Sequence, residues 1–489
     1  MIDEETLDKY QMTVGIECHV QLSTDTKLFS GANNDARDKS PNSVVSPIDY
    51  ALPGMLPVLN HKAIEFAIKA GSALNSKIAP VSRFDRKHYF YPDLPKGYQI
   101  TQMYQPIILA GSINVPLEDG SSIDVRINHA HLEEDAGKLT HHGDHSLVDL
   151  NRAGTPLIEI VSEPDIHSAS QAKAYVTELY RLMTYAGVTN GDLYHGNMRF
   201  DVNISVALKG SDKLGTRSEV KNLNSFRSVE RAADFEFSRQ IALLEAGEIV
   251  VQETRGWDEA KQKTTSQRSK EDAQDYRYMP DADIPPIILS ESEIKDIQST
   301  MPALPPFYRD QWKDFGLDNT VVNALLLSQS TVQLLQRIYE KSGDKIMARR
   351  VGLWLSVVAG NQADVDGDTR NNNLTINITE DQFIELSNMV EANELSSTAA
   401  KEILFDMLAR DETPRMIALE KNLIQVSDES AILAIVDEVL NDPSSVRAVE
   451  DIKNGSDKAI GFLVGQVMKR SQGKANPELV QKLIREKVI

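Results

Sequence analysis

The chain has 489 residues, enough for about three domains at roughly 150 residues each. Its 41% hydrophobic and 25% charged residues are the balance of an ordinary globular protein and exclude a disordered or fibrous chain. The formal net charge of −20 argues against broad, nonspecific wrapping of nucleic acid or membrane, so an anionic partner must meet a local basic patch.

Targeting signals are absent from the sequence. The stretch MIDEETLDKY lacks the character of a signal or transit peptide, and no apolar run approaches the length of a bilayer span. The one cysteine, Cys18, excludes an internal disulfide and a cysteine-based zinc site, which favours a reducing compartment. We therefore expect a cytoplasmic protein.

The segment from Val14 to Leu22 alternates apolar and polar residues, which predicts a β-strand. Its even positions are apolar, whereas Glu17, His19 and Gln21 share the other face. On this pattern alone, the favoured interpretation is a half-buried strand whose polar face meets water.

The segment FDRKHYFYPDLPKGYQI (84–100) holds basic residues among aromatic ones. Lys87 could neutralise a phosphate or an anionic substrate, and Lys96 and Arg86 are alternatives. In the competing interpretation, the aromatic residues 89–91 belong to the core and the basic residues are surface charges.

Two further segments place carboxylates beside strand-like stretches. HLEEDAGK (131–138) contains Glu133, Glu134 and Asp135, and PLIEIV (156–161) contains Glu159 within an apolar run. An ionised side chain in such a run is costly unless it is paired or bound to a cation. Glu159 therefore needs a partner.

A second alternating segment, from Arg199 to Val206, groups Arg199 with Asp201 and Asn203 on one face. Carboxylates and a histidine that converge across strands would make a divalent-cation site. Oxygen ligands favour Mg²⁺, although an imidazole more often indicates Zn, Mn or Fe.

Two helices are predicted in this first part of the chain. A capping-box pattern from Ser168 to Gln171 starts a helix that runs to about Ala186, and apolar residues from Phe226 to Leu244 form one face of another. Between them, RSEVKNLNSF (217–226) is dense in hydrogen-bonding side chains that could contact a ligand or only cap the second helix.

Proline clusters at 282–290 and 301–307 mark a linker. After it, apolar residues that recur three and four positions apart predict helices. The character of the sequence changes again near residues 412–414.

The last part of the chain is basic. Residues 452–489 hold eight Lys or Arg and three Asp or Glu, a net charge of +5. This basic tail, with Lys469, Arg470 and Lys474 around a glycine, is either a solvated helical face or an RNA-binding surface.

Several catalytic motifs are missing from the sequence. It has no GxxxxGK[ST] loop and no GxGxxG after a strand, which argues against a P-loop or Rossmann nucleotide site. It also has no GxSxG and no cysteine paired with a histidine in a familiar context, so it offers no evident amidase or esterase nucleophile.

Taken in order, eight segments resemble the B subunits of the aspartyl/glutamyl-tRNA(Asn/Gln) amidotransferases, the GatB family. The resemblance covers essentially the whole chain and rests on VGIECHVQL, FDRKHYFYPDLPKGYQI, HLEEDAGK, NRAGTPLIEIVSEPDI, MRFDVNIS, RSEVKNLNSFRSVERA, RSKEDAQDYRY and DKAIGFLVGQVMKRSQGKANP. The chain lacks the cysteine pairs that give some relatives a zinc site.

The resemblance implies an α+β fold in three domains. These would be a cradle domain of largely antiparallel sheet with helices (1–295), an all-α helical domain (296–411) and an all-α YqeY-like tail that binds tRNA (412–489).

The resemblance also implies site residues. His19, Glu133 and Glu159 would be the Mg²⁺ ligands, and Glu17, Lys87 and Asp201 would be catalytic. Lys87 and Asn203 would contact ATP, and Lys469, Arg470 and Lys474 would contact tRNA.

The implied reaction converts Glu-tRNA(Gln) or Asp-tRNA(Asn) to the amide form. ATP would phosphorylate the side-chain carboxylate, and ammonia from a glutaminase A subunit, braced by a small C subunit, would displace the phosphate. Two rivals stay open: a noncatalytic tRNA-binding scaffold and a metal-dependent hydrolase. Neither membrane nor DNA is an expected partner, and the sequence does not decide between the two misacylated tRNAs.

Overall fold

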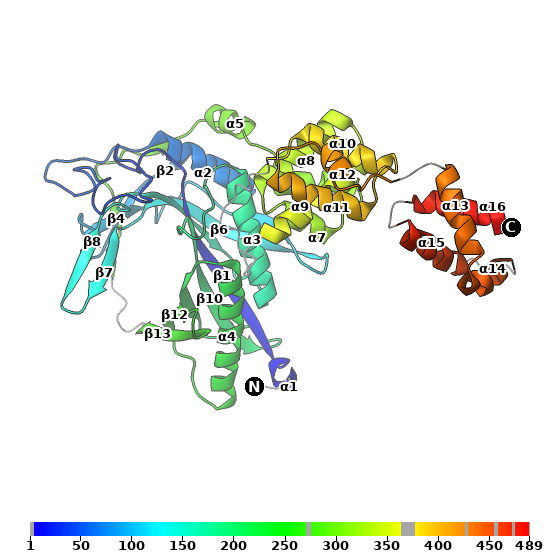
Figure 1. Cartoon of the computed structure of the whole chain (residues 1–489). Helices are drawn as coiled ribbons and strands as arrows, with labels where there is room; N and C mark the ends of the chain where they lie inside the picture. Colours follow the sequence, from blue (N-terminus) through cyan, green and yellow to red (C-terminus); the bar gives the residue numbers. More distant parts are fainter. Residues whose placement is uncertain are drawn as a thin grey trace. The chain divides into compact units, whose positions relative to one another are not determined.

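The structure is a computed structural model that describes residues 4–269, 275–362, 377–425, 429–453, 458–471 and 475–488. Contacts divide the chain into two compact units, an N-terminal unit that runs to Gln311 and a C-terminal unit that begins at Trp312. The N-terminal unit is mixed, with a large antiparallel-rich sheet and helices, whereas the C-terminal unit is helical where the structure describes it (Figure 1). This composition is compatible with the expected α+β class.

One large sheet forms the centre of the N-terminal unit. Its neighbouring strands are antiparallel except for β11 with β12, which are parallel. Across the described residues, the order is β13 (Lys263–Ser269), β12 (Glu253–Asp258), β11 (Ser218–Leu223), β10 (Met198–Leu208), β1 (Tyr10–Gln21), β9 (Pro156–Ser162), β6 (Ser122–Glu134) and β5 (Gly111–Pro116).

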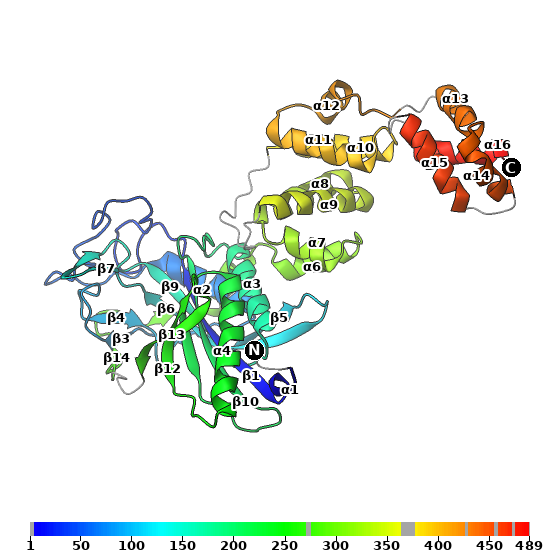
Figure 2. The ribbon, with the colours of Figure 1, turned by 60° about the horizontal axis from the view of Figure 1, so that its bottom comes forward.

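The alternation predicted for the first strand is present in β1. Val14, Ile16, Cys18 and Val20 are at most 1% exposed, and they face a core that includes residues of α2 (His61–Ala73), α3 (Ala169–Tyr185) and α4 (Phe226–Glu245). Figures 1 and 2 show α3 and α4 side by side along the sheet. Because side chains alternate along a strand, Glu17, His19 and Gln21 lie on the opposite, polar face.

Both predicted helices of this unit are confirmed, and their ends follow from local residues. The Ser168 side chain accepts a hydrogen bond from the Gln171 backbone N–H at the start of α3. Ser225 caps α4 in the same way, with a capping box to Ser228. Gly187 and Gly247 follow the two helices with positive φ angles of 72° and 73°, which glycine adopts without strain.

Short strands and helices complete the N-terminal unit. Three small pairings are β14 (Met279–Pro280) with β3 (Asp85–His88) and β4 (Tyr98–Thr101), β15 (Ile287–Ile288) with β2 (Val81–Ser82), and β7 (Lys138–His142) with β8 (His145–Asp149). The remaining helices are α1 (Glu4–Leu7), α5 (Glu291–Ser299) and α6 (Pro305–Lys313), which crosses the boundary between the units.

The C-terminal unit consists of helices, as the apolar spacing predicts. They are α7 (Asn319–Leu325), α8 (Gln329–Ser342), α9 (Lys345–Gln362), α10 (Glu380–Glu391), α11 (Ser397–Ala409), α12 (Pro414–Glu420), α13 (Glu429–Leu440), α14 (Val446–Lys453), α15 (Lys458–Arg470) and α16 (Pro477–Val488). Helix α12 contacts α10 and α11, whereas α13 to α16 share a core of their own around Val436, Leu463 and Ile484. The three-domain division at 295 and 411 stays a prediction.

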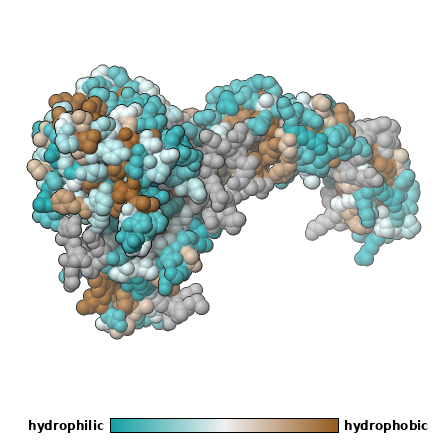
Figure 3. Space-filling view, turned by 60° about the vertical axis from the view of Figure 1, so that its left-hand side comes forward, coloured by the Kyte–Doolittle hydropathy of each residue, from teal (hydrophilic) through white to brown (hydrophobic). Residues whose placement is uncertain are grey.

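The face of the molecule that Figure 3 shows carries hydrophobic patches among hydrophilic residues. In the N-terminal unit, Leu52, Met55, Leu56 and Val58 are between 47% and 69% exposed within one short segment. Clustered exposed apolar side chains of this kind are typical of surfaces that bind another protein. In the helices that the structure describes, no stretch combines the length and apolar character needed to cross a bilayer.

A buried carboxylate ties α4 to the far strands of the sheet. Glu236 is 0% exposed and accepts hydrogen bonds from Arg239 at 2.8 Å and from Thr264 of β13, while Arg255 Nε of β12 lies 3.0 Å from it. Burial opposes the charge of Glu236, but its hydrogen bonds to Arg239 and Thr264 and the arginine charges lower its pKa.

We expect Glu236→Gln to lower the free energy of unfolding at pH 7 by about 3 kcal/mol, because it leaves two arginines around a neutral side chain. A carboxyl with a lowered pKa stabilises the fold above its unfolded pKa, so the difference from wild type should shrink below about pH 4. Urea unfolding at several pH values measures both effects. Glu259→Gln, which removes an exposed partner of Arg231, is the control and should cost less than about 0.5 kcal/mol; equal losses would contradict the assignment.

Candidate functional site

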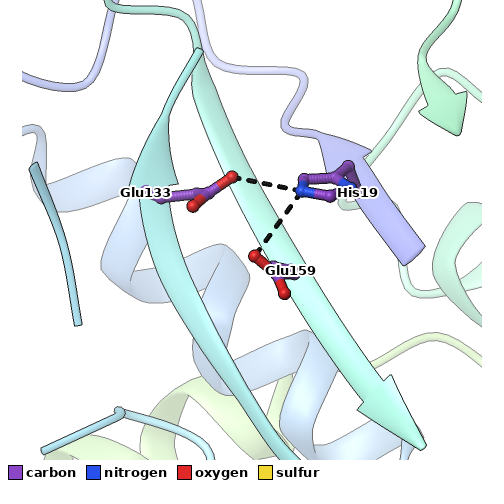
Figure 4. Close-up of side chains that lie close together, drawn as sticks. All are labelled: His19, Glu133 and Glu159. Atoms are coloured by element: carbon purple, nitrogen blue, oxygen red, sulfur yellow. Dashed lines mark ion pairs between the residues drawn. The ribbon is translucent and has the colours of Figure 1, made fainter. Parts of the chain in front are cut away.

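Three side chains from neighbouring strands meet on the polar face of the sheet. His19 projects from β1, Glu133 from β6 and Glu159 from β9 (Figure 4). His19 Nε2 lies 3.4 Å from Glu133 Oε1 and 3.5 Å from Glu159 Oε2. One ligand atom from each residue lies within 4.8 Å of those of the other two. The structure thus brings together the three residues expected to be metal ligands, which we call the triad.

Strand register explains why these residues meet. In the antiparallel ladder, Glu159 lies directly opposite His19 on β1 and directly opposite His131 on β6, and His19 in turn lies opposite Arg199 on β10. Directly opposite residues on one face of a sheet have adjacent side chains. These four charged or titratable residues therefore form a row across four strands. Glu159, which was expected to need a partner, has an imidazole on each side.

His131 is a member of the site that the sequence reasoning missed. Its Nε2 lies 3.4 Å from Glu159 Oε2 and 3.7 Å from Glu133 Oε2, and its ring stacks on His129 with 5.4 Å between centroids. Alternation along NHAHLEE places His129, His131 and Glu133 on one face, and this signal was available in the sequence.

The charges of this row compensate one another. Burial disfavours a charged imidazole, but the neighbouring carboxylates of Glu133 and Glu159 raise the pKa of His131 to about 10, and they also raise the pKa of His19. Burial also opposes ionisation of Glu159, yet the two histidines hold its pKa well below the usual range. A divalent cation could supply the positive charge that these imidazoles supply here, and carboxylate and imidazole are suitable ligands for it.

A second acidic cluster lies beside the triad. Ligand atoms of Glu17, Asp201 and Glu219 lie within 4.8 Å of one another, and Lys221 Nζ is 2.9 Å from both Asp201 Oδ2 and Glu219 Oε1. Burial and the charges of Glu159 and Glu219 raise the pKa of Glu17, whose Oε1 accepts a hydrogen bond from Asn203 at 3.0 Å.

Glu17, Asp201 and Asn203 were expected near the site, and the structure places them there. Glu219 was not singled out, although alternation along SEVKNL puts it on the same face as Lys221.

Two arginines flank the triad through one carboxylate. Asp135 Oδ2 accepts hydrogen bonds from Arg152 at 2.8 Å and from Arg199 at 3.0 Å. Asp135 is half-buried between these cations, whose charges outweigh the desolvation that would raise its pKa, so its pKa is lowered. Arg199 lies opposite His19 in the sheet, so its contact with Asp135 holds a positive charge next to His19.

The basic residues of the aromatic segment have different surroundings. Lys87 lies over the rings of Tyr276, at 5.0 Å, and Tyr89, at 5.8 Å, and it forms no ion pair with any residue that the structure describes. Lys96 instead pairs with Glu134, and Arg86 pairs with Asp281 and Asp283. Residues 90 and 91 are 74% and 45% exposed, so the competing interpretation as core aromatics is wrong for them.

The structure describes two of the three tail residues expected to contact tRNA. Lys469 is exposed near the end of α15, and Arg470 pairs with Asp442 and, at 3.7 Å, with Glu438. Lys474 lies outside the described residues.

Comparison with known proteins gives two matching family models. The model described as the GatB/GatE catalytic domain matches residues 12–295, and the model described as the GatB domain matches residues 356–488.

Similar proteins of full length share one description, the B subunit of aspartyl/glutamyl-tRNA(Asn/Gln) amidotransferase. The protein from Alkalilimnicola ehrlichii is 43% identical over 486 residues, which cover 98% of this chain and 99% of the relative. Those from Caldicellulosiruptor saccharolyticus and Synechococcus elongatus are each 42% identical; both alignments cover 98% of this chain, with 99% and 98% of the respective relatives.

We expect Glu159→Gln to weaken binding of Mn²⁺, a spectroscopic probe for a divalent-cation site, by at least about tenfold, because the triad loses one of its two carboxylates. Electron paramagnetic resonance of free Mn²⁺ measures the affinity. Glu163→Gln, a carboxylate just beyond the end of β9, is the matched control and should bind Mn²⁺ like wild type. Equal affinity in the Glu159 variant would exclude the triad as the cation site.

Proposed function

Because this chain belongs to the GatB family of amidotransferase B subunits, we propose that its triad holds the Mg²⁺ ion used in ATP-dependent activation of a misacylated tRNA. The chain is a subunit of the tRNA-dependent amidotransferase, a carbon–nitrogen ligase of protein biosynthesis with glutamine as amido donor. The observation that carries the proposal is the convergence of His19, Glu133 and Glu159 within 4.8 Å.

The reaction needs an activated carboxylate. The side-chain carboxylate of the misacylated Glu or Asp is a poor acceptor for ammonia, because oxide would have to leave. An oxygen of that carboxylate attacks the γ-phosphorus of ATP, ADP leaves, and an acyl phosphate forms. Ammonia then attacks the carbonyl carbon, phosphate leaves, and the nitrogen loses a proton to give the amide. Bound Mg²⁺ would neutralise charge on the transferred phosphoryl group.

Residues of the chain itself would position these groups. His131 orients Glu159 and Glu133, as the outer partner of a metal ligand commonly does. Glu17, two residues from His19 on the same face, has a pKa raised by burial and by neighbouring carboxylates, which suits it to accept the proton that the nitrogen loses. Asp201 would hold Lys221 beside Glu17.

Two residues would contact ATP. Lys87 is available for a phosphate because it forms no ion pair within the part of the chain that the structure describes. Asn203 keeps its amide carbonyl for a hydroxyl or amino donor while its nitrogen donates to Glu17.

The chain would work in a complex with a glutaminase A subunit, a small C subunit and misacylated tRNA. Ammonia must come from elsewhere because the sequence has no evident amidase nucleophile. The exposed apolar residues Leu52, Met55, Leu56 and Val58 support a protein partner on the N-terminal unit. The layout as cradle (1–295), helical domain (296–411) and YqeY-like tail (412–489) belongs to this proposal, as does a cytoplasmic location.

Glu133→Ala and Glu159→Ala should each abolish ATP-dependent amidation in the reconstituted complex, because each removes a carboxylate of the cation site. Their affinity for tRNA should stay within about twofold of wild type, because neither side chain belongs to the basic tail. Amide formation on misacylated tRNA, with glutamine and then ammonium as donor, and filter binding of the tRNA measure the two properties. Glu118→Ala, an exposed carboxylate in the N-terminal unit, is the control.

The same assay separates the rival functions. Turnover retained in both variants would overturn the catalytic assignment and favour a noncatalytic scaffold. Phosphate release from ATP without any requirement for aminoacyl-tRNA would instead favour a metal-dependent hydrolase.

Removal of residues 426–489 should weaken tRNA binding and lower its salt dependence, because the basic tail neutralises phosphates. The truncation keeps α12 with its partners α10 and α11. In the full chain, Lys469→Ala should reduce the slope of log affinity against log salt by about 1, whereas Lys295→Ala, in the N-terminal unit, should leave it unchanged. Binding measured at several salt concentrations tests this, and an unaltered slope in the truncated chain would refute a tRNA-binding tail.

A further inference from the structure

A second, smaller sheet of the N-terminal unit lies against the strand that carries Glu133. Strand β6 belongs to the large sheet, whereas β3 and β4 belong to the three-stranded sheet, in which β3 carries Lys87. In the proposed function, Lys87 and the cation held by Glu133 act on the phosphates of one ATP molecule. The spacing between the two sheets therefore matters to the reaction.

Two side chains of β4 join the sheets. Gln99 Nε2 donates a hydrogen bond to the backbone carbonyl of Glu134 at 2.8 Å, and Thr101 Oγ1 donates to Glu133 Oε2 at 3.5 Å. Gln99 and Thr101 are two residues apart on one strand, so they share a face, and both are buried. We call these two residues the seam.

Gln102 fastens the same edge of β6 beside the seam. It is 0% exposed, and its Oε1 accepts hydrogen bonds from the backbone N–H groups of Leu132 at 3.0 Å and Ile107 at 3.3 Å. Unpaired buried N–H groups are costly, so this double contact favours one position of the β6 backbone next to the triad. The seam therefore acts against a strand edge that is itself held.

The seam also reaches the surroundings of Lys87. Lys87 lies directly opposite Gln99 in the ladder of β3 and β4, so the two side chains lie on one face of the small sheet. The Tyr89 hydroxyl donates to Gln99 Oε1 at 3.5 Å, and the Tyr89 ring centroid lies 5.8 Å from Lys87 Nζ. The amide of Gln99 thus contacts both the ring beside Lys87 and the strand that carries Glu133.

Electrostatic effects also place this ring near the triad. Burial raises the pKa of Tyr89, and the charges of Glu133 and Glu134 raise it further. The Tyr89 ring lies 6.1 Å from that of Tyr276, the other aromatic side chain beside Lys87. Because Coulomb interactions weaken with distance, these charges agree with the contacts made by the seam.

We propose that the seam sets the spacing between Lys87 and Glu133. Gln99 is then a positioning residue for Lys87, and Thr101 is a positioning residue for Glu133. The proposal rests on the function proposed above, in which Lys87 contacts a phosphate of ATP and Glu133 holds the cation. Each seam residue acts through the side chain that it holds and not through a substrate.

A double-mutant cycle in the assembled amidotransferase complex tests the role of Gln99. Gln99→Leu should lower kcat for amidation about tenfold in the wild-type background. In the Lys87→Met background it should lower kcat by less than about twofold, because the side chain through which it acts is gone. Gln240→Leu is the matched control, since it removes a buried glutamine that ties α4 to β10; it should change kcat by the same factor in both backgrounds.

The cycle distinguishes failure of this proposal from failure of the proposed function. If Lys87→Met lowers kcat and Gln99→Leu lowers it by the same factor in both backgrounds, the positioning role of Gln99 is overturned and the role of Lys87 stands. An unchanged kcat in Lys87→Met would overturn the role of Lys87 in the reaction, and the role of Gln99 with it.

A binding measurement that needs no turnover tests the role of Thr101. Thr101→Val removes the hydroxyl beside Glu133 at nearly constant volume and should weaken Mn²⁺ binding about tenfold, as measured by electron paramagnetic resonance of the free ion. Thr101→Ser keeps the hydroxyl and should restore the affinity to within about twofold of wild type. Gln99→Leu should bind Mn²⁺ like wild type. Wild-type affinity in Thr101→Val, or equal losses in the Val and Ser variants, would overturn the positioning role of Thr101.

Discussion

Charge compensation around Glu159 is the constraint on which the polar site depends. A carboxylate within a sheet is costly unless its neighbours compensate it. Strand register places an imidazole on each side, His19 on β1 and His131 on β6. The two rings and the second carboxylate, Glu133, are therefore fixed by backbone pairing, and a cation bound there would find its ligands already oriented.

The two faces of the large sheet have separate tasks. On one face, residues such as Val14 and Ile16 pack against a core that helices α2, α3 and α4 cover, and this burial stabilises the unit. The other face holds the triad and the acidic cluster. Because successive residues of β1 alternate between the two faces, the side chains proposed to act in catalysis project from a paired strand and need no loop to hold them.

The sequence predicted the elements better than their pairing. The alternation of apolar and polar residues is a local pattern. It therefore predicted strands β1 and β10, and it predicted that Glu17 and His19 share a face. Register depends on which distant segments lie side by side, and nothing local shows that Glu159 faces His131. The family resemblance supplied the ligand set instead. The burial of the aromatic segment could not be decided from the sequence, because exposed aromatic residues at a surface and core aromatic residues have the same composition; Phe90, which is exposed, illustrates this.

The single thiol of the chain lies directly behind this site. Cys18 stands between Glu17 and His19 in β1 but points to the apolar face, where it is 0% exposed and where burial raises its pKa. Alkylating and oxidising agents attack the thiolate form and need access to it. Native protein should therefore resist them, and the rate at which Cys18 becomes labelled would report how often the central strands separate. The labelling rate of this one thiol would thus measure how often the sheet that carries the triad opens.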